Sequence, residues 1–249
     1  MRHGANAGVS AVIQARMGSS RLPGKSMMPV AGQPALAHVI RRSRLARGVE
    51  EVYVATTTAD RDAPIVDLCD SLSVGVYRGS EDDVLARFAG TVRHFGIDVV
   101  VRITGDNPLV GHDVIDYVVD QHFERGADMT SAYHSRTYPN GTIVSVIGVS
   151  VIDYLAGLEA RGSVREHIVT GIDLVRERFV VHLAEAPEAW RRPDLRYCID
   201  DGDDLLVVRG LCDALFAGGA EPTTAEVIRF LDEHDDLRAI NAAAAARPY

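Results

Sequence analysis

Short apolar segments alternate with amphipathic helical stretches through the first half of this 249-residue chain. The apolar segments have the length and β-branched content of buried strands, and the stretches between them carry apolar residues at helical spacing. Strands are expected at residues 10–14, 51–55, 74–77 and 98–103, and helices at residues 34–47, 63–71 and 81–95. This alternation favours an α/β fold, with a mainly parallel sheet covered by helices on both faces.

The second half of the chain changes character. A turn signal at residues 138–141, Tyr-Pro-Asn-Gly, precedes a β-rich stretch at residues 142–149. Beyond it, helices are expected at 151–160, 164–175, 203–216 and 224–233, and strands at 179–183 and 195–199. Because the sequence contains neither an internal repeat nor a clean linker, we expect one domain over residues 9–241, with flexible termini at 1–8 and 242–249.

Lys25 is the only lysine among the 26 lysine and arginine residues of the chain. It ends a loop rich in glycine and serine that follows the first expected strand and also contains Arg16 and Arg21. Lysine carries a compact charge on a slim stem, whereas arginine presents a wide planar fork, so this position favours contact with a crowded anion. A loop of this kind between a strand and a helix is typical of phosphate binding. Its spacing is that of neither a P-loop nor a GxGxxG motif, and an ordinary turn is the alternative.

The overall charge argues against nucleic acid as a partner. The formal net charge is −9 and the sequence pI is about 5.4, so we expect no broad basic surface. Three cysteines, Cys69, Cys198 and Cys212, lack the spacing of a metal site and are expected to be buried thiols in a reducing cytoplasm. No apolar segment reaches the length of a membrane span, and residues 1–8 do not resemble a signal peptide.

Two aspartates, Asp106 and Asp200, each follow an apolar segment predicted to be a strand. Ligands of parallel sheets bind at the carboxyl ends of the strands, and Mg²⁺ is held there by a few carboxylates together with phosphate oxygens. The alternative is that Asp200 only caps the next helix, which is the role we expect for Asp203. No Ser/His/Asp or Cys/His arrangement is evident, so covalent catalysis is not expected.

These motifs, in this order, resemble those of the cytidylyltransferase family. The resemblance is strongest to the spore-coat polysaccharide biosynthesis proteins of the F type, relatives of the 3-deoxy-manno-octulosonate and acylneuraminate cytidylyltransferases. It extends over residues 9–216 and rests on the segments at residues 12–25, 54–57, 77–85, 102–109, 165–167 and 196–200.

The resemblance implies a Rossmann-like nucleotidyltransferase fold, CTP as co-substrate, Mg²⁺ and a homodimer. It implies that Arg16, Arg21 and Lys25 are catalytic. It also implies a set of nucleotide-binding residues that includes these three: Ala15, Arg16, Gly18, Ser19, Ser20, Arg21, Lys25, Ala55, Thr56, Arg78, Ser80 and Gly105. Asp106 and Asp200 would hold the metal. The acceptor would be bound by Tyr138, Asn140, Arg165, Glu166 and His167, within a segment at 133–193 that covers the acceptor and forms the dimer.

One departure from the resemblance bears on the acceptor. Related sequences carry a Gly-Leu-Asp-Val-Glu pattern after the Tyr-Pro-x-Gly turn, whereas Ile143 and Ser145 stand at the two acidic positions of this chain. Losing two carboxylates makes a site less hostile to anions. The chain is therefore predicted to transfer CMP from CTP, with release of pyrophosphate, to a phosphonate, a sugar phosphate or a sugar acid. The alternative is that both positions only pack the β-ribbon.

Two other functions remain open at this point. A nucleotidyltransferase that uses GTP or another base on a sugar phosphate would need only a few different contacts in the base pocket. A non-catalytic nucleotide-binding protein is disfavoured because it would have no use for Lys25, Asp106 and Asp200 together. A dehydrogenase of the Rossmann class is disfavoured by the missing GxGxxG motif.

Overall fold

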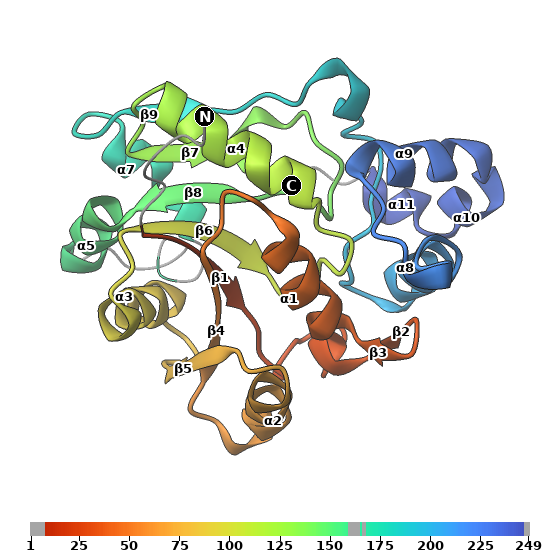
Figure 1. The fold of residues 1–249 in the computed structure, drawn as a ribbon, viewed down its shortest axis with the longest axis horizontal. Coiled ribbons are helices and arrows are strands. Elements are labelled where there is room, and N and C mark those ends of the chain that lie inside the picture. The colour runs from red at the N-terminus through yellow and green to blue at the C-terminus, as the bar shows by residue number, and fades with distance from the viewer. Residues whose placement is uncertain (1–7, 159–164, 166–167, 247–249) are drawn as a thin grey trace.

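A seven-stranded sheet forms the centre of the computed structural model, which describes residues 8–158, 165 and 168–246. The strands lie in the order β5-β4-β1-β6-β8-β7-β9 (Figure 1). All neighbours are parallel except at β8, which is antiparallel to both β6 and β7. Their bounds are β1 (Val9–Gln14), β4 (Glu51–Thr57), β5 (Gly75–Gly79), β6 (Val99–Thr104), β7 (Met129–Ser131), β8 (Ser145–Gly148) and β9 (Val181–Leu183).

Helices cover both faces of the sheet, as the sequence predicts (Figure 1). On one face, α1 (Ala35–Leu45), α2 (Ala63–Ser71) and α4 (His112–Glu124) pack on alternate strand residues such as Ile13 and Ile103. On the other, α3 (Val84–Phe95), α5 (Val149–Gly157) and α7 (Ile172–Val175) pack on the residues in between. The α/β class with a mainly parallel sheet is therefore confirmed.

A third apolar cluster lies beside the sheet and is built largely by the C-terminal part of the chain. It joins Leu109 and Tyr197 to α8 (Gly202–Leu215) and α9 (Thr224–Glu233). Two short helices follow, α10 (Asp235–Ile240) and α11 (Ala242–Ala245), so the residues from 242 to 245 form a helical turn where the sequence predicts a loose tail. Gly8, at the other predicted flexible end, accepts hydrogen bonds from the backbone of residues 98 and 99. Residues 1–7 and 247–249 lie outside the described residues.

Three predictions about elements need correction. The segment 195–199 is not a strand: it makes one isolated β-bridge, between Arg196 and Asn140, because it lies beside loops and not beside a strand of the sheet. The predicted helix at 164–175 is, in its described part, a short 3-10 helix at Ile168–Gly171 followed by α7. The sequence prediction also missed α4 and β7, although the buried residues 114, 115, 118, 119 and 122 of α4 have helical spacing.

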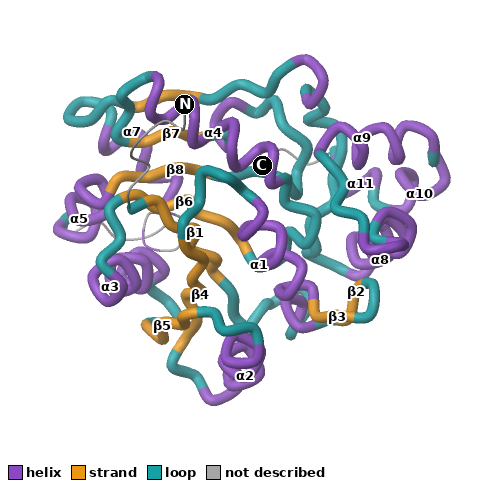
Figure 2. Tube along the Cα trace, in the orientation of Figure 1, coloured by secondary structure: helices purple, strands orange, loops and turns teal. Residues whose placement is uncertain are grey.

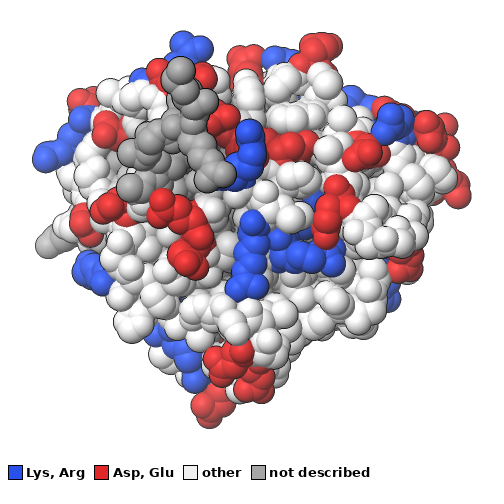
Figure 3. All heavy atoms as spheres, in the orientation of Figure 1, with Lys and Arg blue, Asp and Glu red and all other residues white. Residues whose placement is uncertain are grey.

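The remaining sequence expectations concern cysteines and membranes. All three cysteines are buried free thiols, as predicted. Among the described residues, no helix is both long enough and apolar enough to span a bilayer. Basic and acidic side chains are interspersed on the face shown in Figure 3, which fits the acidic composition.

His122 gives the fold a dependence on pH. It is 4% exposed, and burial lowers the pKa of its imidazole to about 4. Below about pH 6.5 the unfolded chain takes up a proton at this imidazole, but the folded chain does not. The contribution of the neutral imidazole to the free energy of unfolding is therefore complete above that pH and is lost as pH falls towards 4. Between pH 7 and pH 5 we expect the free energy of unfolding to fall by about 2 kcal/mol on this account. Urea unfolding at both pH values should show a smaller difference in His122→Gln, and an unchanged one in His94→Gln, whose imidazole is exposed.

Candidate active site

A cavity of about 330 Å³ lies at the carboxyl end of β1, where ligands of parallel sheets bind. Most of its wall comes from the chain between β1 and α1, which is largely loop (Figure 2). The remaining lining residues come from α3 and from the segment before α8. The full lining is Gln14, Ala15, Arg16, Ser19, Ser20, Arg21, Lys25, Ser26, Val84, Arg87 and Asp200.

The loop after β1 is held in shape by its own backbone. The carbonyl of Met17 accepts hydrogen bonds from the N–H groups of Ser19 and Gly24, at 3.0 and 2.8 Å, and the N–H of Met17 donates to Asp62 Oδ1 at 2.8 Å. Gly24 has a φ of +75°, a left-handed conformation that glycine adopts readily. The turn leads directly into the 3-10 helix η1 (Lys25–Met27), which fixes the lysine at its first residue.

Glycine is also required where the loop passes the neighbouring strand. A Cβ atom at Gly105, which directly follows β6, would lie 2.9 Å from Ala15 Cβ and 3.1 Å from the carbonyl oxygen of Gln14. Because Gly105 has no side chain, the loop after β1 and the residues after β6 can lie close together. This contact brings Asp106 to the edge of the cavity.

Lys25 joins the two predicted metal carboxylates. Its Nζ lies 2.5 Å from Asp106 Oδ2 and 2.8 Å from Asp200 Oδ1, and the three side chains are 14%, 21% and 19% exposed. Burial works to lower the pKa of the ammonium, but the two carboxylates outweigh it, so the pKa lies above its usual value. These three residues are far apart in the sequence, and the structure brings their side chains together at one point.

Asp200 is held by two further cations. Arg21 lies 2.9 Å from its Oδ1, and Arg196 donates to its Oδ2 at 2.6 Å. Burial works to raise the pKa of this carboxyl, but Lys25 and the two arginines outweigh it and lower the pKa to about 2. Asp200 is therefore ionised at neutral pH, with its charge compensated by these three cations.

Sequence reasoning missed the residues that support Asp200 from behind. Arg196 also donates through Nε and Nη2 to Asp204, both at 2.8 Å, and Asp204 is fully buried on α8. Asn241, next to α11, donates to the same carboxylate at 2.8 Å. The spacing 196, 200, 204 is regular, but no sequence signal marks Asp204 as buried. Cys198 lies beside the carboxylates of Asp200 and Asp204, a grouping that could in principle hold a metal. Arg196 already donates to both carboxylates, and burial raises the pKa of the thiol well above its usual value, so this trio is not a favourable metal site.

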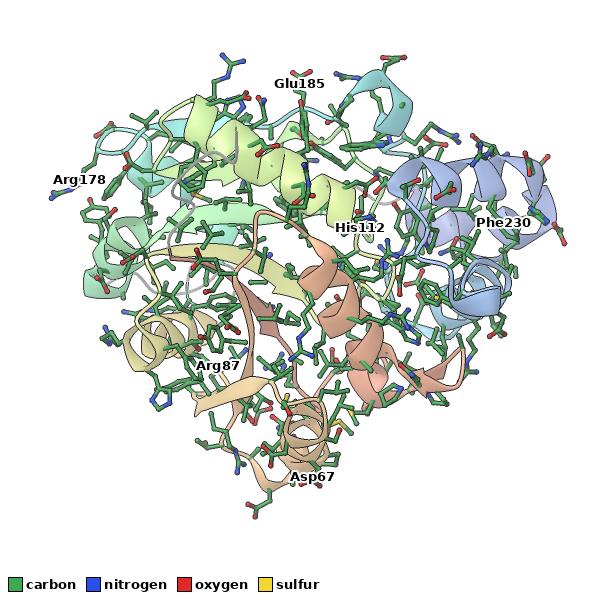
Figure 4. All side chains as sticks on the ribbon, in the orientation of Figure 1. Asp67, Arg87, His112, Arg178, Glu185 and Phe230 are labelled. Carbon is green, nitrogen blue, oxygen red and sulfur yellow. The ribbon has the colours of Figure 1, made fainter. Side chains whose placement is uncertain are left out.

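Arg87 is a second residue that the sequence analysis did not single out. It belongs to α3, beside the central strands (Figure 4), is 2% exposed, and donates to the carbonyl of Ser80 at 2.6 Å. Burial, together with the nearby charge of Arg16, lowers the pKa of its guanidinium to about 10. Arg16 and Arg87 thus both line the cavity, with Asp62, Glu81 and Asp83 near enough to offset part of their mutual repulsion.

Several predicted nucleotide residues lie around the cavity without lining it. Thr56 Oγ1 donates to Asp62 at 3.3 Å, and Arg78 donates to the carbonyls of Thr57 and Ala59, each at 3.0 Å. Ser80 Oγ accepts from the backbone of residue 83, Gly18 lies against the Arg61–Glu81 ion pair, and the carbonyl of Ala55 accepts from Ala15. These contacts shape the ends of β4 and β5, and nucleotide binding by these residues stays a prediction.

The predicted acceptor residues that the structure describes, Tyr138, Asn140 and Arg165, do not line the cavity. Tyr138 is fully buried in a core cluster, and Asn140 bonds through its backbone to residues 195 and 197. Arg165 forms an ion pair with Asp83 at 3.0 Å. Glu166 and His167 lie outside the described residues. The acceptor roles of all five therefore stay predictions.

Comparison with known proteins identifies the family. The model described as "Cytidylyltransferase" matches residues 10–160, which is more than half of the chain. The chain belongs to the cytidylyltransferase family. Lys25, Arg21 and Asp106 of this cytidylyltransferase all lie within the matched residues, whereas Asp200 lies beyond them. The enzyme is a CTP-dependent nucleotidyltransferase, as the resemblance in its motifs implies.

Relatives cover nearly the whole of this cytidylyltransferase. The spore coat polysaccharide biosynthesis protein SpsF of Bacillus subtilis (strain 168) is 29% identical over 232 residues, which are 90% of this chain and 94% of that protein. A 3-deoxy-manno-octulosonate cytidylyltransferase of Anaeromyxobacter sp. (strain Fw109-5) is 36% identical over 126 residues, about half of each chain. The solved structure of a cytidylyltransferase from Leptospira borgpetersenii superposes with a TM-score of 0.86 and 26% identity, covering 93% of this chain and 96% of that one.

Proposed function

We propose that this enzyme transfers CMP from CTP to an oxyanion of its acceptor, with Mg²⁺ as the metal and pyrophosphate as the second product. The observation that carries the proposal is Lys25, whose ammonium lies between Asp106 and Asp200 at the edge of the cavity. A cation that could bind phosphate and two carboxylates that could bind a metal are thus in direct contact. Nucleotidyl transfer uses both the cation and the metal-binding carboxylates. A protein that only bound nucleotides would not need the carboxylates.

The cavity wall supplies the charge that a triphosphate requires. Arg16, Arg21, Lys25 and Arg87 all line it, so four cations face a space of about 330 Å³. Fixed cations of this kind stabilise the negative charge that spreads over the phosphate oxygens in the transition state. The described lining contains no histidine, which suits an acceptor that is already an anion and needs no general base.

The carboxylates of Asp106 and Asp200 fit a divalent cation. Their oxygens already share one cation, the Lys25 ammonium, at 2.5 and 2.8 Å. Carboxylate oxygens are the donors that Mg²⁺ prefers, together with phosphate oxygens and water. When bound, the metal would polarise the α-phosphate and neutralise charge on the leaving group.

The residues of the chain then perform one displacement. An oxygen of the acceptor forms a bond to the α-phosphorus, and the bond from that phosphorus to the oxygen that bridges to the β-phosphorus breaks. The electron pair of the broken bond leaves with pyrophosphate, so no proton has to move. Arg16 and Arg21 orient the triphosphate, and Lys25 exchanges part of its contact with the carboxylates for contact with phosphate oxygens.

The two positions that depart from the family pattern have different surroundings in the structure. Ile143 packs against a core cluster, so at this position packing alone accounts for the residue. Ser145 is 1% exposed, and its Oγ has no hydrogen-bond partner among the described residues. The prediction of an anionic acceptor (a phosphonate, sugar phosphate or sugar acid) therefore depends on Ser145 and not on Ile143.

The proposal includes the setting of the enzyme. We infer a homodimer formed through residues 133–193, in the cytoplasm, acting on small molecules and not on nucleic acid. Two large apolar side chains of that segment support the dimer, because Leu174 and Val180 are 45% and 54% exposed. An apolar surface of this kind is commonly covered by a partner.

The test is the release of pyrophosphate from CTP, GTP, UTP and ATP, each with Mg²⁺ and a panel of phosphonates, sugar phosphates and sugar acids. We expect release from CTP with one acceptor class, at least tenfold faster than from any other nucleotide. Faster release from GTP would overturn the cytosine assignment and keep the mechanism. Binding of CTP with no release across the whole panel would overturn transfer to these acceptors.

A further inference from the structure

A row of polar side chains crosses the sheet face that α3 and α5 cover. In the strand register, Arg102 of β6 lies beside Ser145 of β8, and Ser145 lies beside Ser131 of β7. Residues two positions away on these strands, such as Val100 and Ile147, belong to the apolar cluster under α3 and α5. Because side chains alternate along a strand, the three polar residues point to that same face. Polar groups at a core position call for an explanation.

Two atoms of this row lack partners. Arg102 Nε and Ser145 Oγ are buried, and neither has a hydrogen-bond partner among the described residues. Nor does any described carboxylate form an ion pair with Arg102. Native structures satisfy nearly all buried polar atoms, so each exception calls for an explanation, of which a bound ligand is one. Here the two orphan atoms belong to neighbouring residues, a guanidinium and a hydroxyl, and both can donate to an oxyanion.

The row lies next to the reaction centre. Two residues beyond Arg102 on β6, Thr104 lies beside Gln14 of the neighbouring strand β1, and Gln14 lines the cavity. Two residues of a strand span about 7 Å, which an arginine side chain can bridge. Asp106 is close enough to act on Arg102: burial lowers the pKa of that guanidinium to about 10, and the carboxylate opposes the decrease. Arg102 therefore keeps its charge at neutral pH.

We propose that Arg102 and Ser145 bind the oxyanion group of the acceptor, a phosphonate, phosphate or carboxylate, beside the α-phosphate of CTP. This inference rests on the proposed function and extends it by naming the subsite. The guanidinium and the hydroxyl both donate to the acceptor, which satisfies the two orphan atoms. A glutamate at position 145, as in the related pattern, would instead neutralise Arg102 from within the protein. Serine leaves that charge for the substrate.

Binding of simple oxyanions tests the subsite directly. Calorimetric titrations of phosphonoacetate, methylphosphonate and acetate into the protein saturated with CMP should show binding of at least one of them, and their order identifies the preferred group. We expect Arg102→Gln and Ser145→Glu each to weaken that binding by at least tenfold. Arg93→Gln, which removes a 65% exposed arginine of α3, and Ser150→Glu, at an exposed serine, should bind as the wild type does.

Two further readouts separate the subsite from a merely structural role. Thermal unfolding identifies a variant that does not fold, and Arg102→Lys, which keeps the charge, should then retain binding to within about threefold of the wild type. For variants that fold, CTP affinity should stay within twofold, and kinetics should show a raised KM for the acceptor. The alternative is that Arg102 serves only to balance the negative charge of Asp106. The Arg102 variants would then lose Mn²⁺ affinity while oxyanion binding stayed unchanged, and the inference would be wrong.

The same experiment distinguishes the two proposals. Oxyanion binding that depends on Arg102, without pyrophosphate release from CTP, would overturn the proposed function and leave the subsite intact. Transfer from CTP with normal acceptor KM in Arg102→Gln would keep the function and overturn the subsite. A wild-type protein that binds none of the three oxyanions would also overturn the subsite.

Discussion

Lys25→Ala is expected to slow pyrophosphate release from CTP by about 100-fold or more. The side chain is the only lysine of the chain and makes the contact that joins Asp106 to Asp200. Its loss removes a fixed cation from the phosphate site and leaves two carboxylates facing one another. Single-turnover kinetics at saturating CTP and Mg²⁺ would measure the loss in the chemical step.

Two comparison variants sharpen this result. Lys25→Arg keeps the charge but replaces a point charge by a planar fork, which does not fit between Asp106 and an Asp200 carboxylate that already contacts Arg21 and Arg196. We therefore expect it to restore less than a tenth of the lost rate. Arg44→Ala, which removes an exposed cation that donates to the carbonyls of Leu72 and Ser73, should be unaffected. Near-normal turnover in Lys25→Ala would remove this residue from the mechanism.

Asp204→Asn should lower the free energy of unfolding by about 3–5 kcal/mol, because it breaks a buried ion pair and leaves the Arg196 guanidinium, which water barely reaches, with Asp200 as its one carboxylate partner among the described residues. Asp204 is fully buried and Arg196 is 9% exposed at the side chain, so neither can be solvated in place. The same carboxylate also accepts from the backbone N–H of Asp200 at 3.0 Å. Urea unfolding would measure the stability, and Mn²⁺ titration would detect displacement of Asp200.

Asp203→Asn is the matched control, since Asp203 is the preceding residue of the same helix but is exposed. It should change stability by less than about 0.5 kcal/mol, as surface substitutions usually do. A loss in Asp204→Asn no larger than that of Asp203→Asn would show that Arg196 finds other partners. The role of Arg196 in holding Asp200 would then have to be abandoned.

Local patterns predicted much of the fold and one half of the site. The apolar residues of β1, β4 and β6 are recognisable because each segment is short, buried and β-branched, and α2 and α9 have the predicted bounds. The loop that ends at Lys25 was found because its residue types are unusual for this chain. Its contacts with Asp106 and Asp200 could not be found in this way, because they join residues 81 and 175 positions apart.

The residues that were missed share a physical cause. The chain contains many arginines, and its sequence does not show that Arg87 is buried or that Arg102 and Arg196 are half-buried. Only the register of β6 and β8 places Arg102 beside Ser145, and a shift of one residue would point both side chains to the other face. The segment before Asp200 looked like a strand because it is apolar, yet it packs against α8 and α9 and not against a strand.

The contact between Lys25 and Asp200 has a consequence for the synthesis of the protein. The chain is made from its N-terminus, so the phosphate loop leaves the ribosome long before Asp200, and Asn241 follows later still. A nascent chain of 150 residues already has the cationic loop and Asp106 but not the second carboxylate. Such a chain lacks the second of the two carboxylates that would hold the proposed metal. Under the proposed mechanism, we expect no transfer from CTP until the segment that contains Asp200 has been made.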